Sequence, residues 1–356
     1  MPNLTLAFTI ALALCYAFIT GFHDAANAIA TSVLTRALSI RNAILMAAGL
    51  NMLGGLISVA VATTIAKGLI HSEFAPPNVV LAALMGAICW NLFTWRLGLP
   101  SSSTHALVGG LVGAAAANGA TFGLQNGALV WTFPYHMYIP AGLLKVLLAL
   151  VISPPLGFLT AWFFMVLLYH IFGKVPSSKL NRPFRRLQVL SAAFMAFSHG
   201  TNDAQQSMGI ITLALIAGGL LPASAVIPYW VKIICAGFMA FGTAAGGWRI
   251  IKTIGRNIME LQPIHGFAAE TSAATVIQIC THLGAPVSTT HVISSAIMGV
   301  GVSRRLSAVR WGVVGNILGA WIMTMPMAAL IAVLAYTIIA VLNPAGSHLL
   351  MTWGSP

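Results

Sequence analysis

The strongest constraint on the fold of this chain is a set of long apolar segments. Those at residues 43–66, 142–172 and 311–342 reach or exceed the roughly 20 residues with which an α-helix crosses a bilayer. Only 6% of the 356 residues are charged, too few to cover a soluble protein of this size. The segments are continuous rather than alternating, which argues against a membrane β-barrel. The sequence therefore predicts an all-α polytopic membrane protein, with Pro154 and Pro155 expected to break or kink the second segment.

Two polar stretches interrupt the apolar sequence. The first is residues 21–31 (GFHDAANAIAT), with Asp24, and the second is residues 198–206 (SHGTNDAQQ), with Asp203. An ionisable residue inside a membrane-spanning segment is energetically costly and by default indicates a functional site. The chain has only five acidic residues, and two of them lie at related positions. A purely structural role for both is therefore the weaker interpretation.

Each acid is surrounded by further polar side chains. An amide follows three positions later, Asn27 after Asp24 and Gln206 after Asp203, so acid and amide share one face of a helix. Carboxylate and amide oxygens suit small cations, and a carboxylate also accepts a proton. Glu270 is a third acid within an apolar run, without a counterpart in the other half. The predicted cation-coupling residues are His23, Asp24, Asn202, Asp203 and Glu270, with Asp24 and Asp203 as the metal ligands if the cation is Na⁺.

Two further stretches, residues 100–105 (PSSSTH) and 286–291 (PVSTTH), combine proline with hydroxyl side chains. Pro and Ser/Thr before an apolar run predict a helix start, whose free N–H groups and positive dipole end attract anions. The run after the first stretch, residues 106–117, is too short to cross a bilayer and suggests a re-entrant half-helix. Together the two starts predict an anion cradle without Arg or Lys; simple N-capping is the alternative. His105 and His291 are expected to fix the local backbone rather than touch the ligand.

The basic residues indicate the orientation of the chain. The net charge is +12, but the cations are scattered between the apolar runs, so a nucleic-acid interface is not expected. Among the 17 Lys and Arg residues, all except Lys67, Lys145 and Lys232 fall on one predicted side. The positive-inside rule makes that side cytoplasmic and leaves both termini outside the cytoplasm. We expect a multi-pass protein of the cell membrane.

An acidic stretch followed by a hydroxyl-rich stretch occurs twice, and the charge pattern gives the two copies opposite directions. That arrangement predicts inverted-topology repeats with broken or re-entrant helices, the usual design of secondary transporters. Residues 1–172 are the expected first transmembrane repeat, residues 173–186 a basic cytoplasmic connector, and residues 187–356 the second repeat. We expect about 10–12 transmembrane segments in total.

At these residues the chain resembles the inorganic phosphate transporter (PiT) family, which couples phosphate uptake to Na⁺ or H⁺. Residues 21–28 are similar to the family's Gly-x-Asn/His-Asp-x-Ala-Asn-Ala signature, residues 198–205 to its second copy, and both Pro-x-Ser-Ser/Thr-Ser/Thr-His motifs are present. The resemblance covers essentially the whole chain and implies a compact prokaryotic member, a homodimer and no cofactor beyond the co-transported cation. The phosphate-binding residues expected from it and from the motifs are Asn27, Ser102, Ser103, Thr104, Gln206, Ser288, Thr289 and Thr290.

Three alternatives remain at this stage. A permease of the same fold for sulfate or another oxyanion would use the same cradle. An ion channel would need a continuous pore, which paired interrupted helices do not suggest. An intramembrane hydrolase built on Ser102, His105 and Asp24 is the least favoured, because nucleophilic catalysis does not require every element twice. We therefore expect a transporter and not an enzyme.

Overall fold

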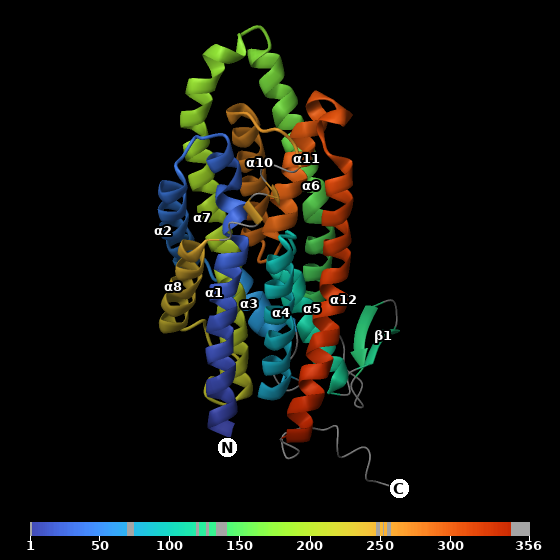
Figure 1. Cartoon of the computed structure of the whole chain (residues 1–356). Helices are drawn as coiled ribbons and strands as arrows, with labels where there is room; N and C mark the ends of the chain where they lie inside the picture. The colour runs from blue at the N-terminus through green and yellow to red at the C-terminus, as the bar shows by residue number, and fades with distance from the viewer. Residues whose placement is uncertain are drawn as a thin grey trace.

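The computed structural model describes residues 2–69, 75–118, 121–125, 128–132, 141–246, 250–251, 253–254 and 258–342. Within them the chain forms an elongated helical bundle with one small β-hairpin at its side (Figure 1). The first part contains α1 (Pro2–Leu34), α2 (Ile40–Ile57), α3 (Ala60–Gly68), α4 (Pro77–Leu97), α5 (Ser103–Ala117), β1 (Thr121–Gln125), β2 (Ala128–Thr132) and α6 (Ala141–Phe172). The second part contains α7 (Ser177–Ala217), α8 (Tyr229–Ala245), α10 (Pro263–His282), α11 (Thr289–Arg304), the 3₁₀ turn η3 (Leu306–Ala308) and α12 (Trp311–Leu342).

Two long helices, α1 and α7, organise the bundle. In Figure 1, α1 rises from the N-terminus at the bottom, whereas α7 descends from its connection to α6 at the top. They therefore run in opposite directions, and they pack against each other. The predicted connector at residues 173–186 is mostly helical, because α7 already begins at Ser177. The beginning of α1 and the end of α12 lie at the same end of the bundle.

Two helical hairpins complete the central part of the fold. The α4–α5 hairpin occupies the lower half of Figure 1 and the α10–α11 hairpin the upper half. Each first arm is followed by a glycine at positive φ, Gly98 (67°) and Gly284 (65°), a conformation that side chains rarely adopt. The carbonyls of both glycines accept a hydroxyl from a distant segment, Gly98 from Thr253 at 2.8 Å and Gly284 from Thr64 at 2.7 Å. The short helix predicted after residue 105 is α5, of 15 residues.

One local expectation was wrong, and for the two prolines of α6 a break was wrong whereas a kink stays a prediction. The run at residues 43–66 is divided into α2 and α3, because Ser58 adopts extended backbone (φ −115°, ψ 154°). The free N–H of Ala62 at the new helix start is bonded by the side chain of Gln205 at 3.0 Å, so the break is compensated from α7. Pro154 and Pro155 do not break α6, which continues over 32 residues. Prolines are tolerated inside helices of membrane bundles, where neighbouring groups satisfy the freed carbonyls.

Five of the described helices are long and apolar enough to cross a membrane. The fold is thus that of a multi-pass membrane protein, as the sequence predicts. The qualifying segments are Leu4–Leu34, Ile40–Ile57, Pro77–Leu97, Leu143–Phe172 and Trp311–Leu342, with Ser103–Ala117 and Tyr229–Ala245 as shorter apolar helices. The expected 10–12 crossings therefore stay a prediction.

The apolar core is divided into two clusters with polar side chains between them. One cluster contains the N-terminal half of α1 with α3, α4 and α5; the other contains the C-terminal half of α1 with α10 and α11. Between them, both acidic stretches and both hydroxyl-rich stretches are buried. Buried polar groups are costly unless hydrogen-bonded, so this layer must satisfy itself internally.

Candidate functional site

Asp24 lies on α1 and contacts the starts of both short helices. Its Oδ2 accepts a hydrogen bond from Ser103 Oγ at 2.6 Å, and its Oδ1 accepts one from Thr290 Oγ1 at 3.0 Å. The ring of His23 lies beside it, with Nδ1 2.9 Å from Oδ1. The carboxylate therefore links α1 to α5 and to α11, although these residues are up to 266 positions apart in the chain.

Asp203 occupies a matching position on α7. Its Oδ2 accepts a hydrogen bond from Thr289 Oγ1 at 2.9 Å, and its Oδ1 accepts one from Asn202 Nδ2 at 2.6 Å and one from Gln206 Nε2 at 3.2 Å. The side chain of Asn202 also bonds the backbone of Val287, donating to its carbonyl at 2.8 Å. Each carboxylate is thus bonded by a hydroxyl from the hairpin of its own half.

The two predicted amides lie next to the same hydroxyls. Asn27 Nδ2 donates to Thr290 Oγ1 at 2.8 Å and to Thr289 Oγ1 at 3.2 Å. Gln206 Nε2 donates to Thr104 Oγ1 at 2.7 Å. Asn27 Oδ1 is buried and has no hydrogen-bond partner in the described part of the chain, so one acceptor of the site is available to a ligand.

Both short helices begin at the site in the same way. Ser102 and Ser288 are the N-caps of α5 and α11, and each accepts the backbone N–H three residues later, at 3.1 and 3.2 Å. Since the first N–H groups of a helix have no intrahelical partner, both helix starts direct positive dipole ends toward the two carboxylates. The sequence predicted these starts correctly.

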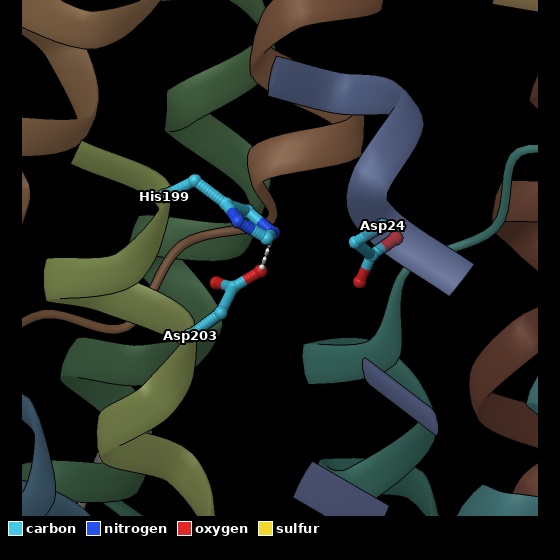
Figure 2. A group of neighbouring side chains, drawn as sticks. All are labelled: Asp24, His199 and Asp203. Atoms are coloured by element: carbon cyan, nitrogen blue, oxygen red, sulfur yellow. Dashed lines mark ion pairs between the residues drawn. The ribbon is translucent and has the colours of Figure 1, made fainter. Parts of the chain in front are cut away.

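Asp24, His199 and Asp203 form a compact cluster of possible cation ligands. One ligand atom from each lies within 4.8 Å of the others, and all three residues are buried. Figure 2 shows the two carboxylates pointing toward each other from α1 and α7, with the His199 ring beside Asp203; its Nε2 lies 3.0 Å from Asp203 Oδ2. Two charged carboxylates at this spacing repel by roughly 3 kcal/mol at an effective dielectric constant near 20, which favours uptake of a cation or a proton.

Glu270 lies in a separate polar cluster. It is fully buried on α10 and accepts hydrogen bonds from the hydroxyls of Thr31 and Ser191 and from Gln188 Nε2, the last at 3.4 Å. None of these partners bonds Asp24 or Asp203. The structure therefore does not bring Glu270 into the cluster of the two aspartates, although α1 contributes to both.

The two motif histidines lie side by side behind the hydroxyls. The rings of His105 and His291 have centroids 4.5 Å apart, and His291 stacks on Trp321 at 3.8 Å. His105 Nδ1 lies 2.8 Å from Ser102 Oγ, and Trp321 Nε1 donates to the carbonyl of Pro100 at 3.0 Å. The contacts of His105 and Trp321 hold the turn that precedes α5. The positioning role expected for the two histidines stays a prediction.

Sequence reasoning missed three residues of the site. His199 precedes Asp203 by one helical turn, an i, i+4 relation that is a readable signal for a shared face. Tyr16 donates to Gln206 Oε1 at 2.7 Å, and Thr94 lies 3.2 Å from His23 Nε2. Neither carries a motif, and only the packing of α1 against α4 and α7 reveals them.

Known proteins match this chain in sequence and in fold. The chain matches the phosphate transporter family over residues 20–332. It belongs to that family. It is 46% identical over 338 residues to a probable low-affinity inorganic phosphate transporter of Rhizobium meliloti (strain 1021), covering 93% of this chain and 97% of the relative. It is 43% identical over 342 residues to the protein of the same description from Bacillus subtilis (strain 168), covering 95% and 98%.

A solved structure described as the sodium-dependent phosphate transporter has the same fold. The TM-score is 0.78 at 26% sequence identity, and the match covers 95% of this chain and 99% of that one. The family resemblance read from the motifs is therefore confirmed. The prediction of a transporter rather than an enzyme is also confirmed, since the family is one of transporters.

Proposed function

We propose that this protein is a secondary transporter that moves inorganic phosphate together with a cation, Na⁺ or H⁺, across the cell membrane by alternating access. The observation that carries the proposal is one hydrogen-bonded network. It joins the two buried acids, Asp24 and Asp203, to hydroxyls at the starts of two helices from opposite halves of the bundle.

Phosphate is bound between the starts of α5 and α11. The side chains available to it are Asn27, Ser102, Ser103, Thr104, Gln206, Ser288, Thr289 and Thr290, all buried. None of them is positively charged, and helix N-termini with hydroxyls bind an oxyanion more weakly than an arginine cluster does. Weak binding suits a carrier that must release its substrate on the other side of the membrane.

The cation and the phosphate are linked through the hydroxyl protons. Ser103, Thr289 and Thr290 each have one O–H, and in this structure each O–H points to a carboxylate. A cation or proton on Asp24 or Asp203 removes the need for these donors, so the hydroxyls turn toward phosphate. Phosphate binding is therefore strong only when the carboxylates are neutralised, which is the condition for symport.

The halves at residues 1–172 and 187–356 are proposed to be inverted repeats that rock against each other, and the protein to act as a homodimer with both termini outside the cytoplasm. Three features support the repeat: α1 and α7 run in opposite directions, the two hairpins occupy opposite halves of the bundle, and the hydrogen bonds match in pairs. Ser103–Asp24 corresponds to Thr289–Asp203, and Asn27–Thr290 corresponds to Gln206–Thr104.

Proteoliposomes with separately imposed Na⁺ and pH gradients test the proposal. Labelled phosphate should accumulate under one of the two gradients, and uptake should saturate and show counterflow. The named solved relative favours Na⁺, whereas the histidines beside the acids, His23 and His199, favour H⁺. Flux that neither gradient drives would contradict symport. Sulfate that competes equally with phosphate would assign the cradle to oxyanions in general.

A further inference from the structure

A second polar site lies away from the phosphate cradle, at the end of the bundle where α6 connects to α7. It is a cavity of about 230 Å³ between α6, the start of α7, the start of α10 and the end of α11. Its walls combine apolar side chains, such as Leu168, Phe172 and Leu180, with polar ones, including Asn181 and Arg304. Among the described residues, no acidic side chain lines it.

Arg304, in the last turn of α11, is the cation of this cavity. Its side chain is exposed and has no hydrogen bond or ion pair with the described residues. Its charge acts on two other lining residues, Tyr169 and His265, and these two side chains lie 3.2 Å apart between Oη and Nε2. A guanidinium next to hydroxyl and imidazole groups matches the needs of a phosphate group.

The position of the cavity along the helices points to the membrane surface. α6 has 32 residues and is about 48 Å long, whereas the hydrocarbon core of a bilayer is about 30 Å thick. The last turns of α6, with Tyr169, therefore reach the headgroup region. The adjoining first turns of α7 carry further cations, Lys179, Arg182, Arg185 and Arg186. Basic pockets between membrane helices at this level suit anionic lipid headgroups.

We propose that this cavity binds the headgroup phosphate of an anionic phospholipid, with Arg304 as its cationic ligand and the apolar wall in contact with the beginning of the acyl chains. Inorganic phosphate has the same charge chemistry, but it would make no use of Leu168, Phe172 and Leu180. The lipid therefore fits both parts of the lining.

The site is connected to the phosphate cradle by two helices. α10 begins beside the cavity, where its N-cap Gln262 is part of the lining, and α11 ends beside it, at Arg304. The other end of α11 carries Thr289 and Thr290, which bond the two aspartates. A bound lipid would therefore stabilise the open end of the α10–α11 hairpin. The turn at the other end of this hairpin leads into the half of the cradle formed by Thr289 and Thr290.

The test is the melting temperature of the purified protein in detergent with added phosphatidylglycerol, phosphatidylcholine or inorganic phosphate. Phosphatidylglycerol should raise it by several degrees more than phosphatidylcholine. Arg304→Gln should lose most of this increment, whereas Arg305→Gln, an exposed neighbour outside the cavity lining, should keep it. Equal increments in both variants would overturn the proposal.

Two further measurements distinguish the remaining outcomes. The effect of inorganic phosphate should be the same in wild type and Arg304→Gln, because it arises at the cradle; a loss in the variant would assign the cavity to free phosphate and overturn the lipid proposal. Leu180→Trp fills the cavity and leaves Arg304 in place. It should also lose the phosphatidylglycerol increment, and it decides the question if Arg304→Gln does not fold. Retention of the increment would contradict the site.

Discussion

The two helices that carry the acids are alike around the acid and unlike beyond it. On α1, Asp24 and Asn27 contact hydroxyls of both hairpins; on α7, Asp203 and Gln206 do the same. A residue directly before each acid, His23 or Asn202, bonds its carboxylate. This equivalence agrees with the proposed binding of one ligand between the two halves.

Beyond the site the resemblance ends. The face of α1 that carries Asp24 continues with Thr31, which is bonded to Glu270. Directly after the end of α1, Thr35 is bonded to Gln188 at 2.7 Å. The positions with the same spacing on α7 are Ile210 and Ala214, both apolar and buried. Polar side chains therefore extend from the site toward the C-terminal end of α1, but no such row follows α7 in the other direction.

This difference distinguishes the binding site from the route that leads to it. The matched centre is the proposed ligand site, whereas the polar row lies only toward one end of the bundle. At that end lies a wide depression lined by residues that include Arg36, Glu260 and Arg310. The row extends from the site toward this depression. For the proposed transporter we therefore interpret it as the polar side of the path by which ions reach or leave the site.

The largest expected effect tests the matched centre. Asp24→Asn and Asp203→Asn should each lower cation-driven phosphate uptake about 100-fold, because each removes the charge on a carboxylate that accepts charged hydrogen bonds, worth roughly 1.5–3 kcal/mol apiece. The measurement is initial uptake into proteoliposomes. The double variant should be no worse than either single one, since both acids serve one event. Undiminished uptake in either single variant would break the equivalence of the two helices.

A smaller effect tests the polar row. Glu270→Gln keeps a similar shape but removes the charge from the cluster with Thr31 and Ser191. We expect uptake to fall about 10-fold with little change in melting temperature, since an amide oxygen still accepts hydrogen bonds, which in neutral form contribute roughly 1 kcal/mol each. Thr275→Val, on the exposed face of the same helix, is the control, because its hydroxyl donates to the carbonyl of Thr271 in its own helix, and it should leave uptake unchanged. Equal activity of the two variants would remove the row from the transport path.

The smallest effect concerns the hairpin turns, where the halves match again. Thr64→Val and Thr253→Val remove the hydroxyls that donate to the carbonyls of Gly284 and Gly98. Each should destabilise the folded protein by about 1 kcal/mol, the usual net contribution of one hydrogen bond, as measured by thermal unfolding in detergent. A large loss from one variant and none from the other would show that the two turns differ in strength. A valine at Thr212, whose hydroxyl bonds only Met208 of its own helix, is the control.

Several features of the site were predictable from local sequence. The helix starts at Ser102 and Ser288 follow from proline and hydroxyls before an apolar run, and the acid–amide pairs follow from helical spacing. The break between α2 and α3 was not predictable, because the bond that compensates it comes from Gln205, 143 positions away. The separate environment of Glu270 was also hidden, since its partners lie on α1 and α7.

The sequence by itself determined that the chain is a membrane protein with two polar motif pairs. That information is local: a bilayer contains no water, so the length of an apolar run and a charge within it can be interpreted without knowing the neighbours. Only the tertiary structure decided that Asp24 meets Thr290, 266 positions away, and that His199 joins the two aspartates. Such contacts depend on which faces of distant helices pack together, and helical spacing relates a residue only to those one turn away.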